Sequence, residues 1–202
     1  METKNTQRGR GRPKTFDRDY ILDVAMRCYW SEGVEAISLN EICRRAKVSK
    51  PALYREFGNE DGLTKAALSR YYEQVLAQLH QIFNSDKSYH ETLDLLIELG
   101  LEASSNLGYP KGCLFVGMRN SAKQVGSNTL NEIEQTNIKI LNTYQNWFEQ
   151  SKNNLEFTSK ITAQFAAIYL HSQLSNAMNQ QAAGENADTT KNVLRLAVSV
   201  LR

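Results

Sequence analysis

The sequence is poor in proline and cysteine, and it has no long apolar stretch. Three of its 202 residues are proline and three are cysteine. The cysteines, Cys28, Cys43 and Cys113, are far apart and form no CxxC pair, which excludes a disulfide framework and favours a reducing cytoplasm. The longest apolar runs, such as residues 112–117, are too short to cross a membrane. No apolar segment follows the basic N-terminus, so we expect no secretory signal.

Patterns for metal binding and catalysis are also missing. The three histidines are scattered, and none has a second ligand type at zinc spacing. Residues 108–112 are rich in glycine and include a lysine, but they lack the spacing of a phosphate-binding loop. No motif for a catalytic nucleophile occurs. We therefore expect no catalytic residues, no metal site and no cofactor, and an enzyme is disfavoured.

Positive charge is concentrated at the start of the chain. The net charge is only +2, yet residues 1–14 contain five cations and one anion. This segment shows no apolar periodicity, so we expect a disordered basic arm. A cationic arm on a nearly neutral body indicates an acidic polymer as partner, and a solubilising tail is the alternative.

Apolar residues then recur at helical spacing, with capping residues at the helix ends. Ser38 and Glu41 match a capping box, in which each side chain bonds to the backbone amide of the other residue. Two short helices joined by a three-residue turn, behind a first helix, form the helix-turn-helix pattern that inserts its last helix into the DNA major groove. The predicted helices cover residues 17–33, 39–46 and 50–57, with caps at Asp17, Gly33, Ser38, Ser49 and Gly58.

The rest of the chain predicts longer helices and no strand. The sequence therefore predicts an all-α protein of about nine helices. We divide it into the arm (1–14), a three-helix DNA-binding domain (15–65) and a second helical domain (66–202). The later helices are expected over residues 60–83, 89–104, 114–122, 130–150, 159–181 and 188–201, and four of their starts have caps at Ser88, Ser127, Thr158 and Asp188.

Several motifs in the first third occur in one register. Arg-Gly-Arg-Pro stands at residues 10–13, an aromatic-x-x-Gly segment ending in Ser-Leu at 30–39, and Leu-Tyr-x-x-Phe at 53–57. With these motifs, residues 11–72 resemble the TetR family of transcriptional regulators. The chain departs from the family pattern at three places. Lys47 replaces a turn glycine, Glu60 replaces a lysine, and residues 51–52 are Pro-Ala instead of Gly-Thr.

The resemblance implies binding to double-stranded DNA. Base edges would be read by the outward side of the helix over 50–57, where an arginine can pair with guanine. Phosphates would be held by Tyr54 and by the preceding helix, where at most one of Arg44 and Arg45 points the right way. The alternative for each cation is a solvated face. The predicted DNA-binding residues are Arg10, Arg12, Ser38, Arg44, Lys47, Ser49, Lys50, Pro51, Ala52, Tyr54 and Arg55.

The resemblance also implies an effector pocket in the second domain. Such pockets are mostly apolar, and an apolar or aromatic molecule would fit. Core packing is the alternative for each residue, and for Cys113 it is favoured over a thiol sensor. The predicted pocket residues are Leu93, Ile97, Phe115, Met118, Tyr144, Trp147, Phe148, Phe165 and Tyr169.

Finally, the resemblance implies a homodimer formed by the last two long helices, which binds a palindromic operator as a ligand-responsive repressor, with an activator as the alternative. Two copies are needed because one helix-turn-helix reads too few base pairs for specificity. A ligand-independent interaction protein with the same DNA-binding head is the competing hypothesis.

Overall fold

The described residues, 16–106 and 108–202, form helices and connecting loops in the computed structural model, and none of them lies in a strand. The predicted all-α class is therefore confirmed. The basic arm, including Arg10 and Arg12, lies outside the described residues. The helices are α1 (Arg18–Glu32), α2 (Leu39–Ala46), α3 (Lys50–Phe57), α4 (Glu60–Tyr71), α5 (Gln78–Phe83), α6 (Tyr89–Asn106), α7 (Leu114–Asn120), α8 (Ser127–Asn153), α9 (Ala163–Ala182) and α10 (Ala187–Val198).

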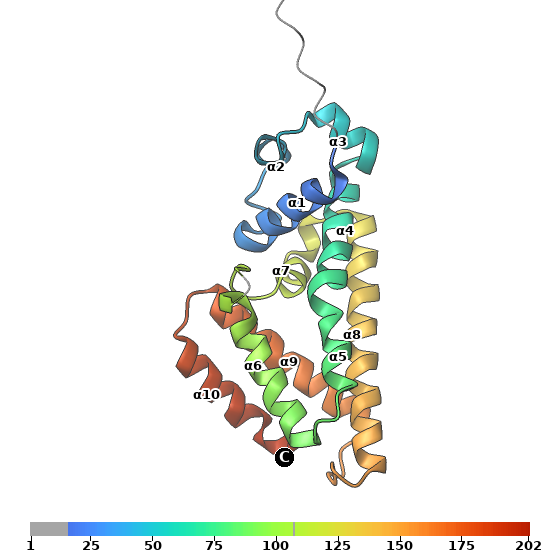
Figure 1. Cartoon of the computed structure of the whole chain (residues 1–202), viewed down its shortest axis with the longest axis vertical. Coiled ribbons are helices and arrows are strands. Elements are labelled where there is room, and N and C mark those ends of the chain that lie inside the picture. Colours follow the sequence, from blue (N-terminus) through green and yellow to red (C-terminus); the bar gives the residue numbers. More distant parts are fainter. Residues whose placement is uncertain (1–15, 107) are drawn as a thin grey trace, which may run out of the picture.

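The helices lie in two groups (Figure 1). Helices α1 to α3 form one end of the molecule, and α6, α9 and α10 pack together towards the other end. Helix α4 begins beside α3 and continues through α5 as one rod, which runs alongside α8. The rod and α8 therefore connect the first three helices to the rest of the structure.

The start of each N-terminal helix is fixed by its own capping side chain. Asp17 accepts a hydrogen bond from the Tyr20 amide at 3.0 Å, and Ser38 accepts one from the Glu41 amide at 3.2 Å. Helices α3 and α4 are capped in the same way by Ser49 and Asn59. The reciprocal half of the predicted capping box does not form, because the Glu41 carboxylate binds arginines instead.

Three predicted caps in the second half are wrong. Helices α9 and α10 start at different capping residues, Thr162 and Asn186, whose side chains accept from the backbone three residues later. Helix α8 starts after Gly126 and is capped by Asp61, a residue of α4. Ser88 does cap α6 and forms a complete capping box with Glu91.

The predicted continuous helix over residues 60–83 is interrupted. Residues Tyr72–Leu76 form a π-helical turn between α4 and α5, in which the Ala77 amide donates to the Tyr72 carbonyl at 2.8 Å. The rod keeps its direction but holds one extra residue in this turn. Such turns interrupt regular helix packing and are frequent at functional sites.

The core contains residues of both predicted domains in one cluster of buried side chains. At its far end, Tyr89 stacks on Trp147 with ring centroids 4.9 Å apart, and on Phe157 at 5.5 Å. Near the rod's start, Leu63, Ala67 and Leu68 are fully buried. The first three helices are therefore packed onto the rest of the fold without an intervening linker, and the domain boundary at residue 65 stays a prediction.

Candidate nucleic-acid interface

Helices α2 and α3 are held close together by small and apolar side chains. Ile42, Cys43 and Ala46 of α2 and Leu53 of α3 are buried. Lys47 ends α2 in the left-handed conformation, with φ 54° and ψ 40°, and the Val48 amide then donates to the Cys43 carbonyl at 3.0 Å. This sharp turn sets the direction in which α3 leaves the α2 helix.

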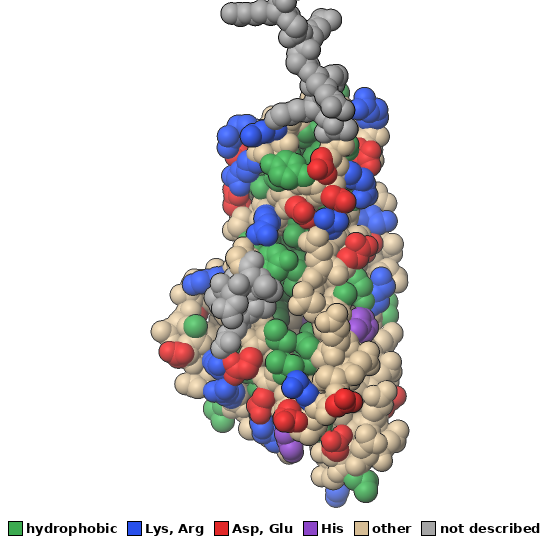
Figure 2. Space-filling view, in the orientation of Figure 1, with side chains coloured by type: hydrophobic (Ala, Val, Ile, Leu, Met, Phe, Trp, Pro, Cys, Tyr) green, Lys and Arg blue, Asp and Glu red, His purple; other side chains and the backbone are tan. Residues whose placement is uncertain are grey.

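The outward side of α3 and its preceding turn carries cations with no ion pair in the described part of the chain. These are Lys47, Lys50 and Arg55, and all three are exposed. The Lys50 ammonium lies 5.5 Å from the centre of the Tyr54 ring, which is itself partly exposed. Lys and Arg side chains gather around this end of the molecule in the space-filling view (Figure 2). The surface can therefore accept several phosphates or base edges at once.

The other predicted DNA-binding residues lie at the same end of the molecule, but they differ in their exposure and in the hydrogen bonds that they already make. Pro51 is exposed and Ala52 is half-buried on α3. The hydroxyls of Ser38 and Ser49 already accept helix-capping hydrogen bonds, so a phosphate would have to bind through their remaining donor capacity. Arg55 also lines a groove of about 480 Å³ between the start of α1 and the α2–α3 turn.

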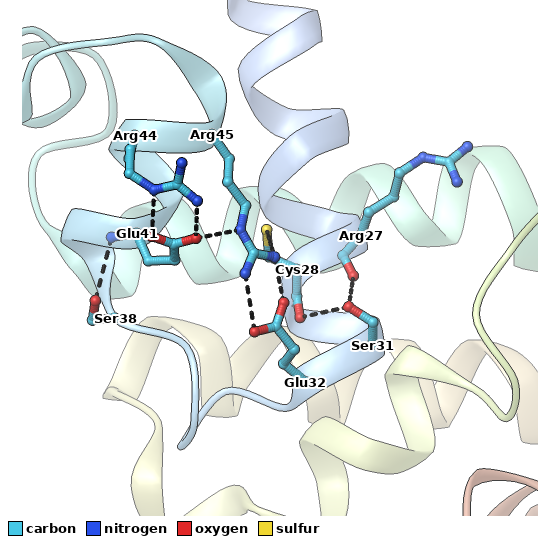
Figure 3. A network of polar contacts seen from close by, with 8 residues as sticks. All are labelled: Arg27, Cys28, Ser31, Glu32, Ser38, Glu41, Arg44 and Arg45. Carbon is cyan, nitrogen blue, oxygen red and sulfur yellow. Dashed lines mark hydrogen bonds and ion pairs between the residues drawn. The ribbon is translucent and has the colours of Figure 1, made fainter.

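Arg44 and Arg45 differ as the sequence predicted, and Figure 3 shows why. Arg45 of α2 is surrounded by acceptors. It binds Glu41 at 2.6 Å and pairs with Glu32 of α1, and its Nη1 lies 3.5 Å from the Cys28 sulfur. Arg44 binds only Glu41, and 72% of its side chain is exposed. Hydrogen bonds from Arg44 and Arg45 lower the pKa of Glu41 to about 2. Arg45 therefore ties α2 to α1, whereas Arg44 is bound within α2 to Glu41 and would reach an outside anion only with its exposed remaining donors.

A second feature is a partly open cavity of about 100 Å³ beside the rod. Of the nine predicted pocket residues, only Phe115 and Tyr144 line it. The other seven do not line it, and their role in a pocket stays a prediction. Phe165 is 56% exposed on α9, and the Tyr169 hydroxyl donates to the Ala197 carbonyl at 2.7 Å. The remaining five are buried in helix packing away from the cavity, namely Leu93, Ile97, Met118, Trp147 and Phe148.

The cavity is lined instead by residues of several helices that sequence reasoning did not select. Trp30 contributes from α1, and Tyr71, Val75 and Leu79 contribute from the rod. The π-helical turn thus forms part of the cavity wall. An unusual backbone turn leaves no sequence signal here, because residues 72–76 contain neither glycine nor proline.

Cys113 also lines the cavity and is not activated. The Tyr71 hydroxyl donates to its sulfur at 3.1 Å, yet burial raises the pKa of the thiol. His171 faces the same cavity. Burial and the nearby Arg119 guanidinium lower the pKa of His171 to about 4, so the imidazole is neutral at neutral pH.

Within residues 16–106 and 108–202, no helix is both long and apolar enough to span a membrane. The same residues contain no group of three or more His, Cys, Asp or Glu side chains placed to hold a metal ion.

The chain is similar to known bacterial regulatory proteins. Residues 21–72 match the model of the bacterial regulatory proteins of the tetR family. The transcriptional repressor ComR of Escherichia coli K12 is 37% identical over 120 residues, which cover 57% of each chain. The repressor BdcR of the same organism is 27% identical over 114 residues, 56% of this chain and 58% of BdcR. The chain thus matches little more than half the length of these relatives.

The fold as a whole is that of solved tetR-family structures. A cysteine mutant of the regulator CifR, solved with a 26-base-pair operator DNA, superposes with a TM-score of 0.80 over 95% of this chain and 100% of that one, at 20% identity. Residues 21–72 of the chain therefore match the tetR family of bacterial regulatory proteins, and the whole chain has the fold of solved tetR-family structures.

Proposed function

We propose that this protein is a cytoplasmic DNA-binding transcriptional regulator that represses its targets as a homodimer and releases DNA when a small effector binds. The observation that carries the DNA-binding part is the group of unpaired cations, Lys47, Lys50 and Arg55, on the outward side of α3 and its preceding turn. The names of ComR and BdcR as repressors, and the operator DNA in the CifR structure, support the same role.

In this proposal α3 enters the major groove. Arg55 reads a guanine edge, and Pro51 and Ala52 offer apolar contacts to thymine methyl groups. Tyr54, Lys47 and Arg44 hold phosphates on either side and so fix the position of α3. Arg10 and Arg12 reach the adjacent minor groove.

The homodimer is formed by an apolar row on α9 and α10. Single exposed apolar residues are common on protein surfaces, but five of them on two helices that pack together, and on the turn that follows α10, favour an interface. Two such helices from each copy would bury the row in a four-helix bundle. The row consists of Phe165, Ile168, Val193, Leu196 and Val200, which are between 47% and 75% exposed.

The effector acts through the rod. The cavity is lined both by the rod and by helices α6 to α9, and the rod begins directly beside α3. A molecule that binds one position of the rod more tightly shifts the spacing of the two α3 helices in the dimer, and the affinity for DNA falls. A cavity at this place supports an effector-responsive regulator over a ligand-independent interaction protein.

The experiment is selection of duplexes from a random DNA library by the full chain, followed by titration of the selected duplex at several salt concentrations. We expect a palindrome with half-sites about 34 Å apart and an affinity that falls steeply with salt. Replacing Lys50 with Ala should reduce the salt slope by about two, because the homodimer loses one cation from each of its two copies.

Arg45→Ala is the matched control, because Arg45 is already bound to Glu32 and Glu41. It should lower the melting temperature of the protein and leave the salt slope unchanged. If no duplex is enriched, or if both variants change the slope equally, the proposed interface is wrong.

A further inference from the structure

We propose that the hydrogen bonds between Asp61 of α4 and the start of α8 hold α3 at a fixed position relative to the body of the protein, which is formed by α6 to α10. Asp61 and Gly126 thereby determine which half-site spacing the homodimer recognises. Asp61 is a positioning residue, because it acts on DNA binding through α3 and not by its own contact with DNA. This inference rests on the proposed function, and it names residues that set the specificity of the same interface.

The connection between α3 and Asp61 has little freedom. Gly58 ends α3, and its amide donates to the Tyr54 carbonyl at 2.8 Å. Asn59 then caps α4 and accepts a hydrogen bond from the Gly62 amide at 2.8 Å. Asp61 lies in this first turn of α4, so no flexible linker separates it from α3. The position of Asp61 therefore fixes that of α3.

The carboxylate of Asp61 is held by α8 through both of its oxygens. One oxygen accepts from the hydroxyl and the amide of Thr129, and the other accepts from the Asn128 amide. The Thr129 hydroxyl also lies 3.2 Å from the Asp61 carbonyl oxygen, and Thr129 is fully buried. Hydrogen bonds to a charged group are directional and about twice as strong as neutral ones. They therefore define one orientation of the first turn of α4 on α8.

Gly126, which precedes α8, leaves the space that this carboxylate occupies. A Cβ on residue 126 would overlap the Asp61 carboxylate carbon and lie 2.6 and 2.7 Å from its two oxygens. The backbone of Gly126 does not itself require glycine, since φ −77° and ψ 172° are open to any residue. Glycine is therefore needed here for the contact with Asp61. These two residues, with Asn128 and Thr129, form a joint between α4 and α8.

The joint leads to the proposed dimer interface. Helix α8 is 27 residues long and packs along α9, which carries part of the apolar row (Figure 1). The distance between the two α3 helices of the homodimer is therefore set through the joint, α8 and α9. Helix α1 also packs on α4 and α7, but packing contacts are less directional than charged hydrogen bonds. Because one base pair moves a half-site by about 3.4 Å and rotates it by about 35°, a loosened joint would let α3 follow half-sites at more than one spacing.

The test compares the wild type, Asp61→Asn and Gly126→Ala on variants of the selected palindrome. These duplexes carry the same half-sites with one base pair added or removed at the centre, and a further duplex carries one half-site only. We expect the wild type to bind at least about tenfold more weakly to the altered spacings. In both variants this loss should shrink to about threefold or less, because α3 is no longer held in one position. Their affinity for the single half-site should stay within about twofold of the wild type, since no residue that contacts DNA is changed.

The choice of variants separates positioning from stability. Asp61→Asn replaces one accepting oxygen with an N–H donor, and Gly126→Ala displaces the intact carboxylate, so the two changes open the joint from opposite sides. Gly117→Ala is the matched control, because Gly117 lies in α7 with open space around a Cβ. Ser88→Ala removes a cap from α6 within the body and should lower the melting temperature. Both control proteins should keep the wild-type loss of affinity at the altered spacings.

The outcomes distinguish this inference from the proposed function. If the wild type selects a palindrome but Asp61→Asn and Gly126→Ala lose as much affinity as the wild type at the altered spacings, the inference alone is wrong. The inference is also wrong if Ser88→Ala reduces this loss equally, because general destabilisation would then be the cause. If the wild type selects no duplex, the DNA-binding function itself is wrong, and the inference fails with it.

Discussion

Asp61 caps the helix that contains Thr129, although the two residues are 68 positions apart in the chain. The Asp61 carboxylate accepts hydrogen bonds from the Thr129 hydroxyl at 2.6 Å and from the Asn128 and Thr129 amides at 2.9 and 3.0 Å. It thereby attaches the first turn of α4, directly after α3, to the N-terminus of α8. A negatively charged carboxylate at the N-terminus of α8 also interacts favourably with the helix dipole.

Replacing Asp61 with Asn should lower the free energy of unfolding by about 1 kcal/mol, because the charged cap is lost while the side-chain volume is kept. Burial raises the pKa of the Asp61 carboxyl, but the hydrogen bonds from Thr129 and Asn128 outweigh it and the net pKa is lowered. The stabilisation is therefore present above the unfolded-state pKa and is lost as pH falls through the lower, folded-state pKa.

Denaturant unfolding of both proteins at neutral pH and at about pH 3 measures this difference. It should shrink at acid pH. Asp86→Asn is the matched control, because Asp86 is exposed and has no hydrogen bond in the described structure. Equal stability of Asp61→Asn and the wild type at neutral pH would contradict the capping role.

Lys47 has opposite effects on folding and on the proposed DNA contact. Its left-handed backbone disfavours any residue with a Cβ, so Lys47→Gly should raise the free energy of unfolding by up to about 1 kcal/mol. The same change removes an exposed ammonium group and should weaken binding to the selected duplex. Thermal unfolding and DNA titration measure the two effects separately.

Lys47→Gln separates the causes, because glutamine keeps the Cβ and removes the charge. It should lower DNA affinity without raising stability. An increase in stability for both variants would mean that the backbone of Lys47 is not strained.

His171 should make the protein sensitive to mild acid. Burial and the Arg119 guanidinium lower its pKa from 6.5 to about 4, so the unfolded chain binds a proton more readily than the folded one. Its contribution to stability is complete above pH 6.5 and is lost as pH falls towards 4, by an amount on the order of 3 kcal/mol.

His171→Gln should therefore show a flatter stability profile between pH 6.5 and 4, measured by denaturant unfolding at each pH. His90, which is exposed, provides the control as His90→Gln. Parallel profiles for the wild type and His171→Gln would show that His171 does not titrate in this range.

Leu196 tests the proposed dimer. It is 75% exposed in the apolar row on α10, and Leu196→Arg should weaken self-association by at least about tenfold because a charge would be buried at the centre of the bundle. Leu155→Arg is the control, since Leu155 is 79% exposed on the loop after α8 and lies outside the row. Sedimentation velocity over a range of concentrations compares the two variants. Identical association would exclude α10 from the interface.

Local features of the first third of the fold could be predicted from the sequence, whereas the caps of α9 and α10 were missed because several capping residues occur near each start, and contacts between distant segments could not be predicted at all. The caps at Ser38 and Ser49 involve an acceptor and a donor only three residues apart, so the pattern is readable along the chain. The cap from Asp61 needs two elements that meet only in the folded molecule. On α9 the exposed apolar residues recur at the same helical spacing as the buried ones. The sequence therefore does not show which of them face inward, and Phe165 was assigned to the pocket.

The candidate interface and the cavity differ in the same way. The exposed residues of α3 follow from helical phase and from the motif at residues 53–57, so Lys50, Tyr54 and Arg55 could be selected in advance. The cavity is a small gap left where four or more helices fail to fill space completely, and its position depends on packing. Trp30 had no sequence feature that linked it to a pocket in the second half of the chain.

The extra residue in the turn at Tyr72–Leu76 determines which side of α5 faces the neighbouring helices. One residue turns an α-helix by about 100°, so a regular helix through this region would present a different side of α5 to α8. Phe83, whose ring lies 5.5 Å from Tyr144 and 5.3 Å from Trp147, would then point elsewhere. Inserting or deleting a single residue in this turn would therefore rotate α5 relative to α4 and change which side chains of α5 face α8. A substitution at the same place would leave this orientation unchanged.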